Sequence, residues 1–413
     1  MASKSVNLTP ISKLFLQVFL PFAVGHFLSN VFRTVNAVIS SNLESEFGIG
    51  AAELGMLTSA YFFAFALFQL PLGILLDRYG PRRVEAMLLI IAGLGALIFA
   101  VGQGLATLTL GRALIGLGVS ACLMASFKAF SLWFDPGRLA LVNGYLMAFG
   151  GLGVVTATVP VDAFVAVTSW RMLFVALAIA CFAISALLWF TVPERGQAPI
   201  SEPLIKQLAA LMALFRTPIF IAVIPAAFFS HALGLAIVGL WSGPWFRDVA
   251  GLQGGAVAAN LMWLAMVTVF GMAAWGVVAD RLGRLGITPL QVGGGGTVIF
   301  LVASVLMVLQ PSDHHLALWM FYAFAATSGS VFYAGLVRRF DGPLAGRVNA
   351  VLNVVVFSGA FILQWGFGVV VQFWTAPDGL NGPGGYQVAF AITAVGQSLS
   401  LAWFVVMSRR AAT

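Results

Sequence analysis

Three basic residues stand inside long apolar stretches of this 413-residue sequence, namely Arg33, Arg112 and Lys128. A charged side chain in apolar surroundings is costly, so it usually faces a cavity or a partner. No acidic residue stands near the middle of any such stretch, because Glu85 and Asp162 both lie close to stretch ends. We therefore expect the missing negative charge to arrive with a ligand. The sequence predicts a site for a small organic anion, such as a carboxylate.

Arg33 has the neighbours that a carboxylate site needs. Asn30, Arg33 and Thr34 are spaced at i, i+3 and i+4, so a helix presents them on one face. A guanidinium can hold a carboxylate through two parallel hydrogen bonds, which favours a role in substrate binding. The alternative is an arginine near the end of its helix whose head extends outward to the membrane surface.

Arg112 and Lys128 are further candidates for contact with the substrate. Arg112 could instead donate to backbone carbonyl groups, which would be a purely structural role. Lys128 stands toward one end of its apolar stretch, so its long side chain could carry the ammonium group to the interface.

His26 and His231 are the only histidines well inside apolar stretches, and they follow Pro21 and Pro225 at nearly the same spacing. Histidine has an unperturbed pKa of about 6.5, so it can exchange a proton at working pH. Since no acidic residue is expected deep in these stretches, one of the two is our candidate for proton coupling. The alternative for each is an uncharged packing residue.

Other polar and aromatic residues could complete the site. Tyr61, Asn353 and Gln364 stand well inside apolar stretches, where they could contact a substrate. Trp245 and Trp374 are better explained as anchors at the membrane interface, a common position for tryptophan.

The elements that must position these residues are membrane-spanning helices. The sequence is 61% hydrophobic and 8% charged, with a mean hydropathy of +1.00, whereas soluble domains carry about 25% charged residues. A helical span needs about 20 apolar residues, and the runs found here are too long and too continuously apolar for strands of a membrane barrel. Twelve spans are predicted, at residues 13–38, 54–76, 84–104, 106–134, 139–164, 169–192, 218–243, 255–279, 287–309, 315–337, 347–374 and 385–408.

Basic residues are divided unequally between the loops on the two sides of these spans. One side holds nearly all of them, whereas the other holds only Arg171 and Arg247. The positive-inside rule then places both termini in the cytoplasm, and we expect a multi-pass protein of a bacterial inner membrane. These loops account for the net charge of +7, so no nucleic-acid partner is predicted. Cys122 and Cys181 both fall in apolar stretches, which indicates neither a disulfide framework nor a zinc site.

A short loop pattern occurs twice, once in each half of the chain. The first copy, Gly-Ile-Leu-Leu-Asp-Arg-Tyr-Gly-Pro-Arg-Arg, begins at Gly73, and the second, Gly-Val-Val-Ala-Asp-Arg-Leu-Gly-Arg, begins at Gly276. Gly73 and Asp77 share a helix face, so the glycine would admit a second helix and the carboxylate would sit at that helix's N-terminus. The candidates for conformational gating are Gly73, Asp77, Arg78, Gly80, Arg82, Arg83, Gly276, Asp280, Arg281, Gly283 and Arg284.

This repeated pattern resembles the loop signature of the major facilitator superfamily, which lies between helices 2 and 3 and is echoed between helices 8 and 9. The first copy departs from that signature only at Pro81. Arg112, followed by Gly116 and Gly118, is similar to the helix 4 element of the superfamily, whose arginine has been linked to energy coupling. The resemblance implies an all-α polytopic secondary transporter, with twelve transmembrane helices in two six-helix bundles related by pseudo-twofold symmetry around a central substrate path.

The widest gap between predicted spans, residues 193–217, is interpreted as a cytoplasmic linker between residues 1–192 and 218–413, each of which holds six spans. Leu204 to Phe215 is an apolar-biased amphipathic segment, which predicts a helix lying on the membrane surface. The alternative is a disordered tether. A substrate site is expected near the midplane between the two bundles.

Two other transport functions stay open. Gly151-Leu-Gly153, followed by Pro160, is an incomplete form of the helix 5 element of drug–proton antiporters in the superfamily, which weakens drug or amphiphile efflux. Met262 and Met266, spaced at i and i+4, suggest copper import, because thioethers suit Cu(I).

An enzyme is not expected, because the sequence shows no nucleophile with its base, no metal-ligand cluster and no nucleotide-binding loop. No cofactor and no metal centre are predicted. The expected partners are a small anionic substrate, the lipid bilayer and either a coupled proton or an exchanged anion. We expect the protein to function as a monomer.

Overall fold

The computed structural model describes residues 11–194, 209, 212–309, 314–340, 342–375 and 381–410. Within these residues, twelve helical stretches are long and apolar enough to cross a membrane, and each overlaps one of the predicted spans. The β pairing in this part of the chain is limited to an isolated bridge between Thr375 and Asn381. The predicted all-α polytopic fold is therefore confirmed. Most of the predicted linker, with most of its amphipathic segment, lies outside the described residues.

The first six spans are built from the elements up to α10. In chain order these are α1 (Ile11–Leu14), η1 (Phe15–Phe19), α2 (Leu20–Thr34), α3 (Asn36–Phe47), α4 (Ala51–Tyr79), α5 (Pro81–Val101), α6 (Leu105–Val119), α7 (Cys122–Trp133), η2 (Pro136–Arg138), α8 (Leu139–Thr156), α9 (Val159–Val167) and α10 (Trp170–Thr191). We call these elements the first bundle.

The last six spans begin at α12, and we call their elements the second bundle. They are α12 (Pro218–Ala227), η3 (Phe228–Ala232), α13 (Leu233–Ala236), η4 (Ile237–Trp241), α14 (Ser242–Asp248), α15 (Gly255–Gly283), α16 (Pro289–Leu309), α17 (His315–Ala326), η5 (Thr327–Ser330), α18 (Val331–Val337), α19 (Gly342–Gln372) and α20 (Pro383–Arg410).

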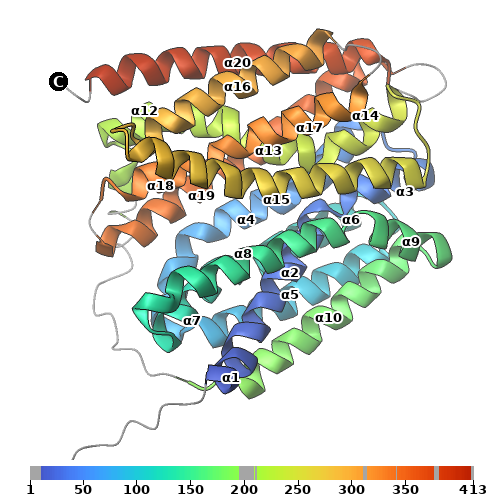
Figure 1. Cartoon of the computed structure of the whole chain (residues 1–413). Helices are drawn as coiled ribbons and strands as arrows, with labels where there is room; N and C mark the ends of the chain where they lie inside the picture. The colour runs from blue at the N-terminus through green and yellow to red at the C-terminus, as the bar shows by residue number, and fades with distance from the viewer. Residues whose placement is uncertain are drawn as a thin grey trace, which may run out of the picture.

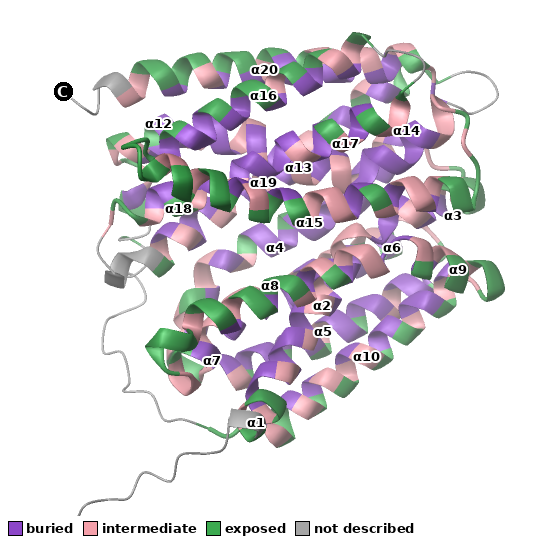
Figure 2. Ribbon diagram, in the orientation of Figure 1, coloured by how far each residue is buried: buried purple, intermediate pink, exposed green. Residues whose placement is uncertain are grey.

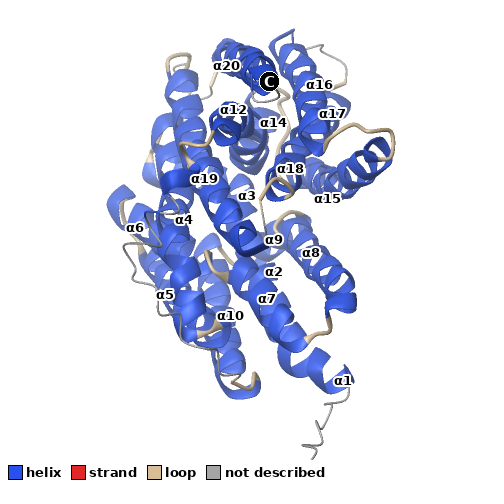
Figure 3. Ribbon diagram, turned by 90° about the vertical axis from the view of Figure 1, so that its left-hand side faces the viewer, coloured by secondary structure: helices blue, strands red, loops and turns tan. Residues whose placement is uncertain are grey.

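The two bundles lie side by side, the first in the lower half of Figure 1 and the second in the upper half, and the turned view in Figure 3 shows the same division. α4 packs along α19, where the rings of Phe65 and Phe357 lie 4.1 Å apart between centroids. α8 packs against α15 in the same interface between the two bundles, which we call the seam. We call the side with α3, α9 and α14 the Glu44 end, and the side with α1 and the C-terminus the terminal end (Figure 1).

The fifth predicted span, 139–164, is wrong at its end. α8 stops at Thr156, and Thr158, with φ −112° and ψ −115°, leaves the helical region before α9 begins at Val159. Pro160 explains the break, because in a continuous helix its ring would clash with the carbonyl group of Thr156. The fourth span is also interrupted, at Ser120 and Ala121 between α6 and α7.

Glycines bring α6 into close contact with its neighbours. A Cβ atom added to Gly116 would lie 2.1 Å from the backbone oxygen of Tyr61 in α4, and one added to Gly118 would lie 2.3 Å from the backbone nitrogen of Ala92 in α5. The same role was predicted for Gly73 and is wrong in this structure. Gly73 is exposed, and a Cβ atom there would meet no atom within 4 Å.

The outer faces of the bundles are apolar rather than polar. Figure 2 shows exposed residues along α8, α15 and α20, whereas the faces toward the seam are mostly buried. Large apolar side chains are strongly exposed on these outer faces, among them Phe190 at 83% and Leu309 at 69%. Apolar surface of this extent needs lipid as its solvent, which agrees with a multi-pass integral membrane protein.

Candidate functional site

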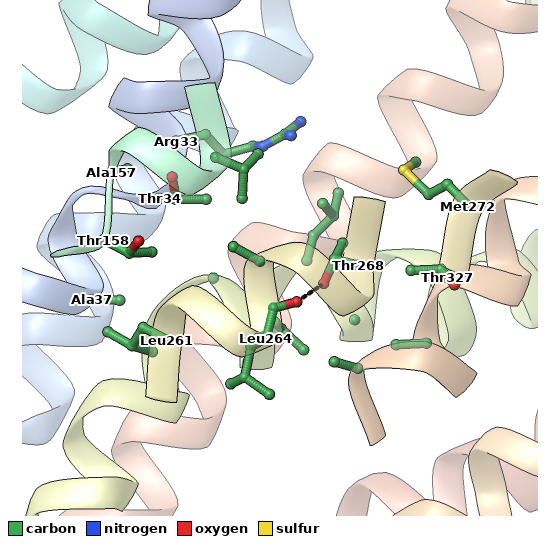
Figure 4. Close-up of a pocket in the computed structure, with 18 of the residues that line it drawn as sticks. Arg33, Thr34, Ala37, Ala157, Thr158, Leu261, Leu264, Thr268, Met272 and Thr327 are labelled. Atoms are coloured by element: carbon green, nitrogen blue, oxygen red, sulfur yellow. Dashed lines mark hydrogen bonds between the residues drawn. The ribbon is translucent and has the colours of Figure 1, made fainter. Parts of the chain in front are cut away.

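A cavity lies at the seam between the two bundles, and Figure 4 shows it in close-up. It holds about 930 Å³ of empty space, counting the part open to solvent. Its walls come from α2, α3, α8 and the turn before α9 in the first bundle, and from η3 to η4, α15, α17 and η5 in the second. Its polar lining residues are Arg33, Thr34, Thr158, His231, Thr268 and Thr327.

Arg33 is placed in this cavity, as the sequence predicted for a substrate-binding residue. It stands in the last turn of α2, partly buried, and Figure 4 shows its guanidinium extended into the cavity. Its Nη2 donates to Oδ1 of Asn30, whose own Nδ2 donates to the backbone oxygen of His26 at 2.8 Å. Among the described residues, no carboxylate forms an ion pair with Arg33. Its charge can therefore be neutralised by a bound anion.

Arg112 and Tyr61 lie outside the cavity, in the core of the first bundle. Arg112 is fully buried, and its Nη1 donates to the backbone oxygen of Phe32 at 3.0 Å. Its guanidinium lies 5.1 Å from the centroid of the Tyr61 ring, a cation–π contact. This geometry favours the structural alternative for Arg112, because the bond to Phe32 fixes the turn that presents Arg33.

Lys128 contacts the first loop signature instead of the cavity. Its Nζ lies 2.8 Å from Oδ1 of Asp77, and each side chain is 34% exposed. Lys128 stands in the middle of α7, so this contact of Asp77 is not with a helix N-terminus. The carboxylate of Asp77 is held by a side-chain cation.

The first signature loop binds the end of α10. Gly80 has a φ of +80°, which a residue with a side chain adopts only under strain. Arg83 pairs with Glu194 at 2.6 Å, and Arg82 donates to the backbone oxygen of Trp189 at 2.5 Å. Arg78 lines the surface hollow beside this loop.

The second copy is bound differently from the first. Asp280 and Arg284 pair with each other at 2.9 Å on the exposed face of α15. Cβ atoms added to Gly276 or Gly283 would meet nothing within 4 Å, and the same holds for Gly73 and Gly80 of the first copy. The two copies therefore differ in their ion pairs and not in the space around their glycines.

We expect Asp77→Asn to slow the transport cycle more than it weakens substrate binding. The change removes the charge that holds Lys128, and a pair this exposed contributes roughly 0–1 kcal/mol to folding. The matched control is Asp280→Asn, whose partner Arg284 directly follows the same helix and so links no second helix to it. Uptake rate and binding affinity should be measured side by side. An equal loss of affinity would instead move Asp77 into the binding site.

The two histidines occupy different surroundings. His231 lies in the π-helical turn η3, a feature frequent at functional sites, and it lines the cavity beside the ring of Tyr333. His26 lies in α2 outside the cavity and packs against Gly150 of α8. Arg33 is near enough to interact electrostatically with both imidazoles.

Glu85 overturns the expectation that the spans hold no buried acidic residue. It lies in α5 with a side chain 0% exposed, packed between Gly25 of α2 and Cys122 of α7. Within the described part of the chain, neither carboxylate oxygen accepts a regular hydrogen bond. An ionised carboxylate without a partner is very costly in such a place, so Glu85 becomes a further candidate for a group that carries a proton.

Asn353 and Gln364 connect α19 to α4 across the seam. Tyr333 donates its hydroxyl to Oδ1 of Asn353 at 2.8 Å, and Nδ2 of Asn353 donates to Oε1 of Gln69 at 3.0 Å. The side-chain amide of Gln364 lies 3.2 Å from the backbone nitrogen of Ser59, and with its oxygen turned toward Ser59 it accepts from that N–H group. Neither residue lines the cavity, so in this structure both join the bundles.

A cluster of charges joins the bundles at the Glu44 end. Arg247 of α14 pairs with Glu44 of α3 in the first bundle and with Asp248 at 2.6 Å in its own. The buried carboxylate of Asp248 also accepts from Asn381 and Tyr386, each at 2.9 Å. The Glu44–Arg247 pair therefore holds the two bundles together at this end.

Among the polar and sulfur-containing lining residues, the sequence interpretation missed four, namely Thr158, Thr268, Met272 and Thr327. A threonine in an apolar run carries little signal, because its hydroxyl can bond to its own helix backbone wherever it stands. The break at Pro160 is the one cue that could have pointed to Thr158.

The fold and the cavity at the seam define a twelve-span membrane transporter of two bundles. Residues 22–364 match the family model described as Major Facilitator Superfamily, and the chain belongs to this superfamily. A solved bacterial homologue of the human lysosomal transporter Spinster, inward-facing and unoccupied, has the same fold. It is 18% identical with a TM-score of 0.79, and the match covers 97% of this chain and 98% of that one.

Several bacterial transporters are similar to this chain in sequence. The uncharacterized transporter YybO of Bacillus subtilis is 33% identical over 177 residues, which is 41% of this chain and 40% of YybO. The probable sulfoacetate transporter SauU of Cupriavidus necator is 20% identical, over 84% of this chain and 85% of the relative. The hexuronate transporter of Bacillus subtilis is 24% identical, over 85% of this chain and 92% of the relative.

Proposed function

We propose that this protein transports a small organic anion, and that Arg33 binds the acidic group of that anion. One observation carries the proposal. Among the described residues that line the cavity, Arg33 is the only one with a formal charge, and no carboxylate of the described chain neutralises it. A guanidinium suits a carboxylate or a sulfonate through paired hydrogen bonds. Two similar transporters are named for the organic anions hexuronate and sulfoacetate, which supports the same class of substrate.

Transport would proceed by alternating access, as the two bundles rock about the cavity. The Glu44–Arg247 pair must break before the cavity can open toward the Glu44 end, whereas the Gln69–Asn353 bond lies nearer the terminal end of α4. If the basic loops lie in the cytoplasm of a bacterial cell, the Glu44 end faces outward across the inner membrane. Each chain supplies a whole cavity, so the cycle needs only a monomer.

Uptake into proteoliposomes tests this function directly. Purified protein should accumulate labelled acid in counterflow when the vesicles are preloaded with the same acid, using glucuronate, sulfoacetate and benzoate as first probes. Saturable binding without accumulation would indicate a receptor. Uptake of lipophilic cations or of Cu(I), with none of any acid, would contradict the proposal.

The coupling step is assigned to a proton, with anion exchange as the alternative. His231 is the first candidate for the proton carrier because it lines the cavity together with Arg33. His26 and the newly found Glu85 are the other candidates, and both are buried in the first bundle.

We expect His231→Gln to retain counterflow exchange but to lose accumulation driven by a pH gradient. Glutamine keeps a hydrogen-bonding side chain of similar size but cannot carry a proton at working pH. His26→Gln and Glu85→Gln should be measured in the same assay, because each removes one other candidate. If all three variants accumulate the acid as the wild type does, none of these residues carries the coupled proton.

The two alternative cargoes gain no support from the cavity. Met262 and Met266 are absent from its described lining, in which Met272 is the one thioether. A cavity whose charged lining group is Arg33 disfavours lipophilic cations, which are common cargo of efflux pumps. We therefore propose neither copper import nor drug efflux.

A further inference from the structure

We infer that the cargo is a monoanion with an apolar body, such as a branched aliphatic or an aromatic monocarboxylate. This inference rests on the proposed function, and it goes further by choosing between kinds of organic acid. Sugar acids and acids with two acidic groups are the kinds that it excludes, so the cargo would differ from hexuronate and sulfoacetate, for which two similar transporters are named. Three features of the cavity carry it, namely the number of its charges, the state of its threonine hydroxyls and the nature of its walls.

The charge of the cavity matches one acidic group. Arg33 is the one formal charge among the described lining residues, and it stands at one side of the cavity in Figure 4. His231 can offer one further hydrogen bond as a neutral imidazole. A second carboxylate on the cargo would lie among apolar side chains without a cation, which is strongly unfavourable.

The hydroxyl protons of the four threonines that line the cavity are already engaged in hydrogen bonds within the protein. Each of the four donates its hydroxyl proton to a backbone carbonyl group three or four residues earlier, at 2.5 to 2.9 Å. Figure 4 shows the bond from Thr268 to Leu264. These hydroxyls present methyl groups and acceptor lone pairs to the cavity, but no free donor. A polyhydroxylated acid would give up hydrogen bonds to water and regain only part of them. The four donors are Thr34, Thr158, Thr268 and Thr327.

The remaining walls are apolar and come from both bundles. Apolar side chains line the space beyond Arg33. They are Leu235, Val238, Leu261 and Leu264 from the second bundle and Val154 from α8 of the first. Each CH₂ group that a cargo buries against such walls should raise its affinity about fourfold. The acid group is thus recognised by Arg33, and the body of the cargo by these side chains.

The test is calorimetric binding to the purified full-length protein. The probes are 4-methylpentanoate, propanoate, glucuronate and succinate, with 4-methylpentanamide as the uncharged control for partition into detergent. We expect 4-methylpentanoate to bind at least tenfold more tightly than propanoate, glucuronate or succinate, and more tightly than its amide. Tighter binding of glucuronate or succinate would overturn this inference and leave the proposed function standing. If no acid binds more tightly than the amide, the proposed function fails as well.

Two variants separate wall contacts from hydroxyl contacts. Val238→Ala removes two methyl groups from the wall and should weaken 4-methylpentanoate severalfold, with little effect on propanoate. Thr268→Val is the matched control, because the hydroxyl it removes is bound to Leu264, so affinity should stay within about twofold. The reverse result is a large loss of affinity in Thr268→Val and none in Val238→Ala. It would show that hydroxyl groups recognise the cargo, and it would overturn the inference.

Discussion

Arg33→Ala is expected to abolish anion binding and transport while leaving the protein folded. The guanidinium extends into the cavity and has Asn30 as its polar side-chain partner, so the fold loses little when it is removed. A bound anion would lose its charge-assisted hydrogen bonds, and truncation of one partner of such a pair costs about 2–5 kcal/mol. This corresponds to a loss of roughly 30-fold to several thousandfold in affinity. Counterflow and binding of one acid should both fall by such factors.

The matched control is Arg171→Ala, which removes the same charge from a partly exposed site. Arg171 pairs with Glu46 within the first bundle, at 2.6 Å, and does not line the cavity. The Arg171→Ala variant should therefore bind and transport the acid as the wild type does. Arg33→Lys should recover part of the affinity, since lysine keeps the charge but not the paired geometry. Unchanged uptake of every acid in Arg33→Ala would remove Arg33 from the site.

The second large effect is expected from Gly116→Ala. The added methyl group would stand 2.1 Å from the backbone oxygen of Tyr61, so α4 and α6 must move apart. Overpacking of this kind costs on the order of 1–3 kcal/mol, which outweighs the gain of about 1 kcal/mol that alanine brings to a helix. We expect a clearly lower melting temperature and a lower yield of folded protein, measured by thermal unfolding in detergent.

Gly73→Ala is the control for that experiment. Gly73 also lies within a helix, but a Cβ atom there would meet nothing within 4 Å, so the melting temperature should hold or rise slightly. Transport by the same variant tests the gating role that the sequence predicted for Gly73. Equal melting temperatures for the two variants would contradict the close packing of α4 and α6.

The fold could be predicted from the sequence because lipid imposes simple constraints. A span must be long and apolar, and its ends are marked by basic loops and by the repeated signature that begins at Gly73 and Gly276. Breaks inside spans were missed, because hydropathy is the same on both sides of Thr158. The position of Pro160 held that information, but a proline in a membrane helix is often accommodated without a break.

The site was predictable in part. Arg33 could be found because a cation in an apolar run is rare and must be explained, whereas a threonine in such a run is ordinary. The same reasoning cannot tell a cation that faces a cavity from one that meets a partner distant in sequence, as Lys128 meets Asp77 and Arg112 meets Phe32. The burial of Glu85 could not be predicted, because it depends on α2 and α7 packing over this residue.

The most direct test of the central claim, that Arg33 binds the charge of the cargo, is a cycle that changes protein and ligand together. Affinities of 4-methylpentanoate and 4-methylpentanamide should be measured for the wild type and for Arg33→Ala, because such a cycle isolates the interaction of the changed pair. We predict that the wild type prefers the acid by at least tenfold and that Arg33→Ala shows almost no preference. An equal preference for the acid in both proteins would contradict the claim.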